Sequence, residues 1–499
     1  MANTFAVSRN HLILGLCLPL AVLLGYLLAD PLESSSLAVI VILTSVLFVP
    51  LLMRWHHLLL VVSWNAAVNP FFFPGRPALW MVMAFISLFF GVLGRSVSTG
   101  HRFVHVPALT WSLLFLLLVI VVTAYFRGGV GLRMLGTSSI GGKGYFFLLS
   151  AIVGYFALTS QTIPRHRARW FVALFFLAGA TAAISNLTYL LGPKFYFLYE
   201  LFPPSLAIDQ WMAEGLTGEN LVRVSGLVGT SQALSCFILS RYGIRGVFDF
   251  ARPWRTVFFL GAVAISLFGG FRSSLILVGM TFAMLFVVEG LWRTRFVFVV
   301  ACIGLVLAGV FAVYVDRMPF SVQRTLSFLP LDVNPEVKQS AEYSTQWRLD
   351  LWREVLPQVP KYLFLGKGFT LNADDLFFIQ ESARRGLVQS YEMFALSGEY
   401  HNGPLSVLIP FGIWGVVALI WFLGAGVRLL FRNHQNGDPA LRQINAFLLA
   451  FFVTRVIFFL SVYGELSTEL FHFTGLLGLS VALNGGEAKP GNRPEPTED

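Results

Sequence analysis

Charge is the scarcest property of this 499-residue sequence: 12% of its residues are Asp, Glu, Lys or Arg, whereas 56% are hydrophobic. Soluble domains carry about 25% charged residues. So few charges cannot cover the surface of a soluble protein of this length, and the composition excludes a soluble enzyme. The repeated apolar runs have the ~20-residue length of bilayer-crossing helices, which satisfy their own backbone in lipid. We therefore predict an all-α, polytopic integral membrane protein.

Cysteine is almost absent as well. Cys17, Cys236 and Cys302 each lie inside an apolar run, and no spacing among them is that of a metal-binding motif. We interpret them as small hydrophobic residues packed between helices. The sequence therefore predicts no disulfide, no metal site and no cofactor.

Apolar runs recur along the chain and predict about 12–14 membrane-spanning helices. The first run, His11–Leu28, has no small-residue cleavage site and is interpreted as a span and not as a signal peptide. The predicted spans lie near residues 11–29, 36–53, 57–72, 78–94, 107–126, 144–159, 169–191, 226–240, 256–269, 273–290, 296–315, 403–429, 443–462 and 469–483. They divide the chain into an N-terminal bundle (1–191), a membrane region with the first outer segment (192–315), a large loop (316–402), C-terminal membrane helices (403–484) and a disordered tail (485–499).

The net charge of +9 is interpreted as a signal of topology. With the N-terminus in the cytoplasm, the inner loops are short and rich in Arg, whereas the outer segments carry an excess of acidic residues. This is the asymmetry of the positive-inside rule, and it predicts that both termini are cytoplasmic. The two large polar segments, about 192–225 and 317–401, then lie outside the cytoplasm. Because topology explains the positive charge, that charge does not indicate nucleic-acid binding.

The outer segment 317–401 is the longest polar stretch of the chain. Within it, Ser344–Leu356 is predicted to be a helix capped by Ser344 or Thr345, because apolar residues recur there at helical spacing. That apolar stripe comprises Trp347, Leu351, Trp352, Val355 and Leu356. Two tryptophans on such a stripe are typical of a helix at a membrane interface. We therefore expect a large, partly helical periplasmic loop that lies on the membrane.

Arginines and one histidine gather on the predicted outer side. Arg223 begins a span, Arg272 lies between two spans, Arg348 lies on the loop helix, and His401 ends the loop. Taken singly, each arginine is equally well explained by contact with lipid headgroups, and the histidine by a structural hydrogen bond. Guanidinium groups bind phosphate and stay charged, and histidine accepts a hydroxyl proton near neutral pH. Together they form a set able to displace a lipid diphosphate from a sugar without a metal ion.

Four segments, in this order, resemble the bacterial O-antigen ligase and O-antigen polymerase superfamily of membrane glycosyltransferases. They are Arg223-Val224-Ser225-Gly226; Phe271-Arg272-Ser273-Ser274; Trp347-Arg348-Leu349-Asp350-Leu351-Trp352 with Leu365-Gly366-Lys367-Gly368 after it; and His401-Asn402-Gly403-Pro404-Leu405. The resemblance covers about residues 215–430. It implies transfer of a glycan from a polyprenyl (undecaprenyl) diphosphate carrier to a hydroxyl of a lipid or glycan acceptor. It places this transfer on the periplasmic face of the bacterial inner membrane, without a metal and with inversion at the anomeric carbon.

The same resemblance assigns roles to individual residues. His401 would be the base that activates the acceptor hydroxyl, Arg223 and Arg348 would bind the diphosphate, and Arg272 would support them. The candidate supporting residues are Lys367, Glu399 and Tyr400. The sequence does not separate a ligase from a polymerase, and it predicts no oligomeric state.

Two acidic positions, Asp374-Asp375 and Asp30, can each be interpreted in two ways. Asp374-Asp375 is interpreted as solvated loop acid, with an outer metal site as the alternative, and Asp30 as a turn residue, with a catalytic acid as the alternative. Arg455 lies within a span and requires a partner that the sequence does not identify.

The alternative function is a transporter or flippase of an anionic lipid or lipid-linked glycan. It predicts charges near the bilayer centre and broken helices in both halves, and it does not require the large outer loop.

Overall fold

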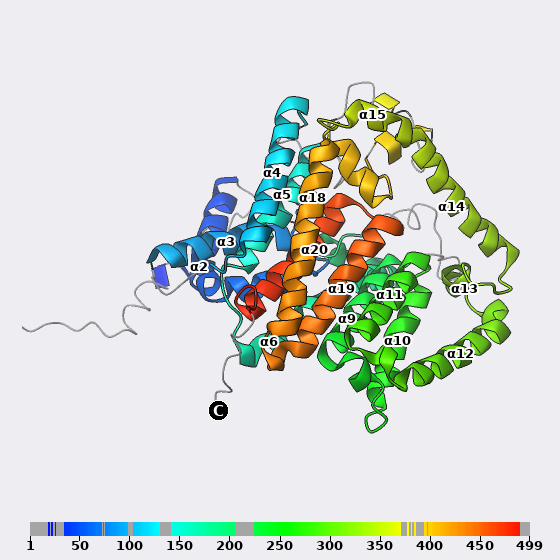
Figure 1. The fold of residues 1–499 in the computed structure, drawn as a ribbon. Coiled ribbons are helices and arrows are strands. Elements are labelled where there is room, and N and C mark those ends of the chain that lie inside the picture. The colour runs from blue at the N-terminus through cyan, green and yellow to red at the C-terminus, as the bar shows by residue number, and fades with distance from the viewer. Residues whose placement is uncertain are drawn as a thin grey trace, which may run out of the picture. The chain divides into compact units, whose positions relative to one another are not determined.

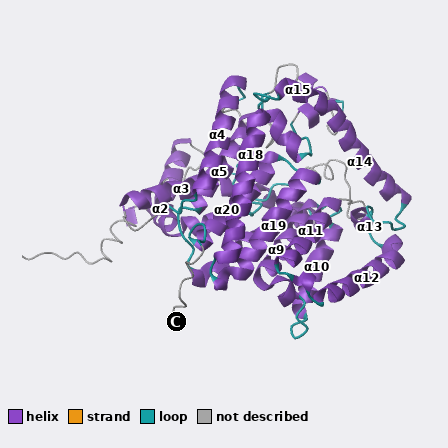
Figure 2. Ribbon diagram, viewed as in Figure 1, coloured by secondary structure: helices purple, strands orange, loops and turns teal. Residues whose placement is uncertain are grey.

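The computed structural model describes residues 34–71, 73, 75–97, 103–129, 141–204, 224–370 and 398–489, together with residues 18–19, 21–22, 25, 377–378, 381, 384–385 and 394–396. Every regular element among them is a helix, which confirms the predicted all-α class (Figure 2). Eight helices in these ranges are long and apolar enough to cross a membrane. The protein is therefore a multi-pass membrane protein, as predicted. The first predicted span, 11–29, lies mostly outside the described residues.

The chain divides into two units, Met1–His56 and His57–Asp499. Helix α2 (Ser34–Trp64) runs through the boundary between them and contains Pro50. The sequence predicts a break here between two spans, 36–53 and 57–72. That break is wrong, because the intervening Arg, Trp and His residues all fit a helix and do not interrupt its backbone hydrogen bonds.

The second unit contains the remaining labelled helices. They are α3 (Leu79–Val97), α4 (Pro107–Arg127), α5 (Gly141–Leu158), α6 (Ala168–Leu177), α7 (Ala182–Leu191), α9 (Ser225–Val247), α10 (Trp254–Phe268), α11 (Arg272–Val288), α12 (Phe296–Tyr314), α13 (Phe320–Leu326), α14 (Pro335–Val355), α15 (Val359–Tyr362), α18 (Gly403–Asn436), α19 (Arg442–Ser461) and α20 (Leu466–Asn484). Short 3-10 turns join several of them, including η2 (Ala178–Thr181) between α6 and α7 and η7 (Leu356–Gln358) after α14. The predicted span 169–191 thus consists of α6, η2 and α7.

An aromatic core joins early and late helices of this unit. Trp64 stacks on Phe471 of α20, with ring centroids 5.2 Å apart. Trp80 of α3 contacts the same ring at 4.5 Å and Phe147 of α5 at 5.1 Å. Gly475 of α20 makes room for the Trp64 indole, which a Cβ at that position would strike. Helix α20 is consequently the most buried of the candidate spans, whereas α12 has no fully buried residue and leaves most of its apolar side chains exposed.

Helix α18 is broken near its first third. Gly412 has φ 63° and ψ −163°, and Pro410 precedes it. The backbone of the loop 363–368 fills this break: Lys367 N–H donates to the Ile409 carbonyl at 2.7 Å, and Ile413 N–H donates to the Leu363 carbonyl at 2.7 Å. Neighbouring helices hold the loop, since Arg127 of α4 donates to the Gly366 carbonyl at 2.8 Å. The backbone groups freed by the break are thus satisfied by protein, as membrane helices require.

Helix α14 is the longest helix in the described part of the large loop and reaches from α13 to α15 (Figure 1). It is capped by Asn334, whose side chain accepts a hydrogen bond from Glu336 N–H at 2.9 Å, and Pro335 occupies its first position. The predicted start at Ser344 is therefore wrong, because the polar first half of the helix hides it from an apolar-periodicity argument. Near its start, Ser340 accepts a hydrogen bond from the buried Arg324 of α13 at 2.6 Å.

Candidate active site

His401 lies immediately before α18 in an unusual backbone conformation. Its φ is 52°, a region that non-glycine residues rarely adopt and that often marks functional sites. Asn402 caps the helix by accepting from Leu405 N–H at 3.1 Å, and Pro404 lies in the first turn. A Cβ at Gly403 would collide with the Phe459 carbonyl of α19, so only glycine permits this approach. The segment 401–404 therefore fixes the histidine at the contact between α18 and α19.

Three aromatic rings surround the His401 imidazole. The ring centroids of Trp347 and Phe394 each lie 5.4 Å from it, and that of Tyr463 lies 5.3 Å away. Trp347 comes from α14, and Tyr463 from the turn between α19 and α20. Parts of the chain more than 110 residues apart therefore define the position of the imidazole.

The apolar stripe of α14 packs on protein. Leu351 and Val355 are fully buried in a cluster with Tyr400, Leu405 and other residues at the start of α18. The indole of Trp352 donates a hydrogen bond to the Tyr400 carbonyl at 2.9 Å. The prediction that this stripe lies on the membrane is thus wrong for its central residues, because α18 supplies an apolar surface that the sequence did not show. Only Leu356, past the end of the helix, is substantially exposed.

Arg348 of α14 lies near an aromatic ring that also contacts His401. Its guanidinium carbon lies 6.0 Å from the centroid of the Tyr463 ring, the same ring that contacts His401. Burial lowers the pKa of Arg348, and the nearby positive charge of Arg272 lowers it further. Two cations held this close to each other are stabilised by a bound anion. The structure therefore brings together three of the predicted site residues: Arg272, Arg348 and His401.

Arg272 is the first residue of α11. Its Nη2 donates to the Ala341 carbonyl at 3.0 Å and to Thr345 Oγ1 at 3.3 Å, both on α14. These hydrogen bonds join the start of α11 to α14; the predicted support of Arg223 and Arg348 in diphosphate binding stays a prediction. Arg223 lies outside the described residues, and so does Asp374-Asp375. The residue after Arg223, Val224, donates from its N–H to the Gly269 carbonyl at 3.0 Å.

The predicted supporting residues have different surroundings. Tyr400 is buried beneath α14, and burial raises the pKa of its phenol. Lys367 contributes its backbone to the break in α18. Glu399 donates from its N–H to the Phe394 carbonyl at 3.2 Å, and its negative charge acts on Tyr463. In the part of the chain that the structure describes, no three His, Cys, Asp or Glu side chains are grouped as metal ligands; metal-free chemistry stays a prediction.

Tyr463 is a site residue that the sequence analysis missed. Burial raises the pKa of its phenol, as do the charges of Glu465 and Glu399, so the ring stays neutral near pH 7. The Tyr463 ring contacts the His401 imidazole and lies 6.0 Å from the Arg348 guanidinium carbon. The available signal was its place: Tyr463-Gly464-Glu465 joins two predicted spans on the same side as His401.

The structure also identifies the partner of Arg455. Its Nε and Nη2 donate to the two carboxylate oxygens of Glu469, at 3.0 and 2.7 Å. Both side chains are about 95% buried, with 5% exposure each. This bidentate pair joins α19 to the first turn of α20 beneath the Tyr463 turn.

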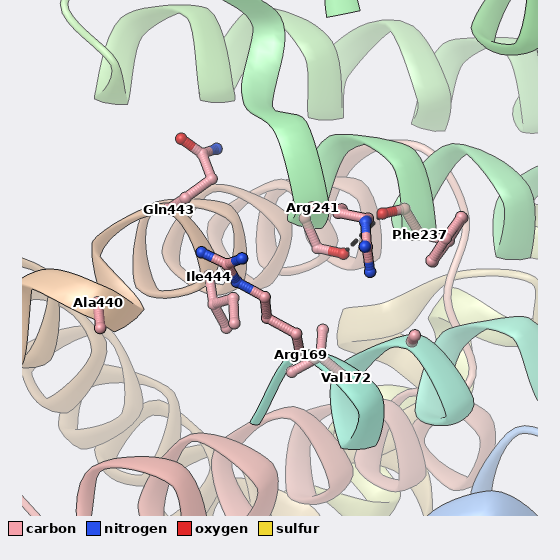
Figure 3. Close-up of a pocket in the computed structure, with 9 residues that line it drawn as sticks. Arg169, Val172, Phe237, Arg241, Ala440, Gln443 and Ile444 are labelled. Carbon is pink, nitrogen blue, oxygen red and sulfur yellow. Dashed lines mark hydrogen bonds between the residues drawn. The ribbon is translucent and has the colours of Figure 1, made fainter. Parts of the chain in front are cut away.

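A small pocket lies at the Arg442 end of α19, away from Tyr463. It holds about 40 Å³ between α6, α9 and the start of α19, and Arg169, Arg241 and Gln443 line it (Figure 3). Gln443 Nε2 donates to Glu289 at 3.0 Å, and the same carboxylate accepts from Ile244 N–H where Gly243 interrupts α9. With 20 residues, α19 separates the two ends by roughly 30 Å.

The apolar helices define an integral membrane protein. The half-buried arginines Arg272 and Arg348, together with His401 at the start of α18, form its candidate site. Residues 230–420 match the family model described as O-antigen ligase. This match covers less than half of the chain and is consistent with the O-antigen ligase and polymerase superfamily that the motifs resemble. A search of curated proteins found no match. The matched range includes Arg272, Arg348 and His401, and its family acts in glycan processing at membranes, by glycosyl transfer.

Proposed function

We propose that this protein transfers a glycan from an undecaprenyl diphosphate carrier to a hydroxyl group of a lipid or glycan acceptor. The reaction takes place on the periplasmic face of the bacterial inner membrane, with both termini of the chain in the cytoplasm. The observation that carries the proposal is the shared contact at Tyr463, which holds the His401 imidazole and the Arg348 guanidinium against one ring. This shared contact supports a displacement in which His401 activates the acceptor hydroxyl and Arg348 binds the leaving diphosphate.

His401 acts as the general base. Its imidazole removes the proton of the acceptor hydroxyl as the acceptor oxygen forms its bond to the anomeric carbon. The bond between this carbon and the diphosphate oxygen breaks on the opposite face of the sugar, so the configuration inverts. Undecaprenyl diphosphate leaves with the bonding electron pair, and the imidazolium returns its proton to solvent. The aromatic rings around His401 restrict the imidazole to the orientation that this transfer needs.

Arg348 and Arg272 stabilise the leaving diphosphate, and Arg223 is proposed to join them. Burial strengthens the attraction between the Arg348 guanidinium and a phosphate oxygen, because less water screens the pair. Fixed positive charge aimed at a leaving oxygen is the electrostatic contribution that a metal ion otherwise makes. The proposed reaction therefore needs no metal, and a chelator should leave the activity of the purified protein unchanged.

The test is the substitution His401→Ala in cells that depend on this chain, with His105→Ala as the matched control at an exposed position before α4. Both proteins must reach the membrane in equal amounts. We expect His401→Ala to abolish mature surface polysaccharide while the lipid-linked donor accumulates in the outer leaflet. Normal polysaccharide, or donor held in the inner leaflet, would contradict the proposal.

The product of the same experiment separates the two activities of the superfamily. Loss of a ligase leaves long glycan chains on the lipid carrier, because polymerisation continues without transfer to the final acceptor. Loss of a polymerase leaves single repeat units on the carrier. The matched family model bears the name of the ligase, which favours the first outcome.

Transport of an anionic lipid or lipid-linked glycan is the second candidate function. Two observations favour it: α9 and α18 are interrupted at Gly243 and Gly412, and the ion pair Arg455–Glu469 lies within the membrane helices. However, that pair is closed by two hydrogen bonds, and loop backbone fills the break in α18. If purified protein in vesicles moves labelled lipid diphosphate between leaflets and His401→Ala preserves this movement, the transport function is the correct one.

A further inference from the structure

An open pocket of about 320 Å³ adjoins Arg272 and Arg348, on the side of α14 that does not pack on α18. The pocket is lined by Arg272, Ser327, Lys338, Ala341, Glu342, Thr345 and Gln346. Five of these residues recur on α14 at helical spacing, so one face of the helix forms the wall of the pocket. Arg348 lies one turn further along α14 from Thr345. The pocket therefore begins at the proposed diphosphate site and extends along α14 toward the start of that helix.

The chemistry of the wall is mixed. Arg272 and Lys338 supply donors, Glu342 supplies an acceptor, and Gln346 supplies both. Gln346 is steadied by its own hydrogen bond to Asp350 Oδ1 at 2.9 Å. A site for an anion alone gains nothing from the Glu342 carboxylate, which repels phosphate. Donors and acceptors in alternation suit a molecule that carries many hydroxyl groups, each of which donates and accepts.

We propose that this pocket binds the sugar residues of the donor glycan next to the diphosphate, and so selects which glycan is transferred. The inference rests on the proposed function, because it assigns the diphosphate to the neighbouring arginines. Arg272 connects the two parts of the donor, since it lines the pocket and its charge also acts on Arg348. The open side of the pocket lets a longer glycan continue into solvent.

The test compares two probes on the full chain in nanodiscs, in a His401→Ala background so that bound donor is not consumed. One probe is undecaprenyl diphosphate without sugar, and the other is the lipid-linked glycan pool extracted from membranes of the host cells. The variant is Glu342→Ala with Gln346→Ala, and the matched control is Gln339→Ala, an exposed amide of the same helix that does not line the pocket. Alanine favours helix, so α14 is retained in each variant.

We expect the double variant to bind the glycan-linked carrier about tenfold more weakly, since each lost hydrogen bond has a modest effect. Its affinity for the sugar-free carrier should stay unchanged, and Gln339→Ala should bind both probes like the parent. Equal weakening for both probes would overturn the inference, because the pocket would then bind diphosphate. Unchanged binding of both would overturn it as well. If the parent protein binds neither probe, the proposed function itself fails.

Discussion

Arginine side chains from neighbouring helices lie near both ends of α19, but their surroundings are opposite. At the Arg442 end, Arg169 and Arg241 line a small pocket and are exposed. At the Ser461 end, Arg348 is half-buried beside the Tyr463 ring, and burial lowers its pKa. An exposed arginine at a helix end is satisfied by water and headgroups, whereas a buried one is costly until an anion arrives. Partial burial beside an aromatic ring and a second cation, and not positive charge by itself, distinguishes the candidate active site.

The strongest test of this contrast substitutes one arginine at each end. Arg348→Ala removes the charge that we propose faces the leaving diphosphate, so we expect a loss of about 10²–10³-fold in kcat. Arg241→Ala changes an exposed side chain, and its effect should stay within about twofold. Glycan transfer by the two purified proteins gives both values. Equal losses at the two ends would contradict the distinction between them.

The buried ion pair Arg455–Glu469, near the Ser461 end of α19, predicts a large effect on stability. Arg455→Met leaves the Glu469 carboxylate buried without its partner, which destabilises a protein by about 3–5 kcal/mol. The double variant Arg455→Met with Glu469→Met removes both charges and should recover most of this loss. Thermal unfolding in detergent measures both proteins. A double variant as unstable as the single one would show that packing at these positions, and not charge, controls the stability.

The contact at Tyr463 predicts a smaller effect, on catalysis. Tyr463→Leu removes the ring that positions His401 and Arg348, and kcat should fall roughly 10–100-fold with little change in KM. Tyr463→Phe keeps the ring and should restore most of the activity. Because burial raises the pKa of this phenol above about 10, the group keeps its proton at every lower pH. The alkaline side of the pH profile below that value should therefore be the same for Tyr463→Phe and the parent; a shifted profile would assign the hydroxyl a direct role.

Apolar periodicity predicted most of the membrane helices, because length and composition alone determine whether a segment crosses a bilayer. It misjudged α2, where polar residues were taken as a loop although they continue the helix. It also misplaced the start of α14, whose first turns are polar on most faces. Capping residues would have corrected the second error, since Asn334-Pro335-Glu336 is a typical helix start.

The candidate site was predicted only in part. Arg272, Arg348 and His401 were found from residue chemistry, and the structure brings them together through Tyr463 and α14. Tyr463 itself was missed because its role depends on a contact across more than 60 residues. The partner of Arg455 was missed for the opposite reason: Glu469, only 14 residues away, was not recognised as a buried residue of α20. Pairing between helices depends on packing that periodicity does not record.

The loop that fills the break in α18 bears on how the protein is made. When α18 first enters the membrane, the backbone groups around Pro410 and Gly412 have no partners within the helix, and each costs several kcal/mol in lipid. Their partners come from residues 363–368, which α4 in turn holds through Arg127. These partners precede α18 in the chain, so they are already synthesised when α18 enters the membrane. The helix that carries His401 at its start is therefore completed only when it docks against the loop and α4.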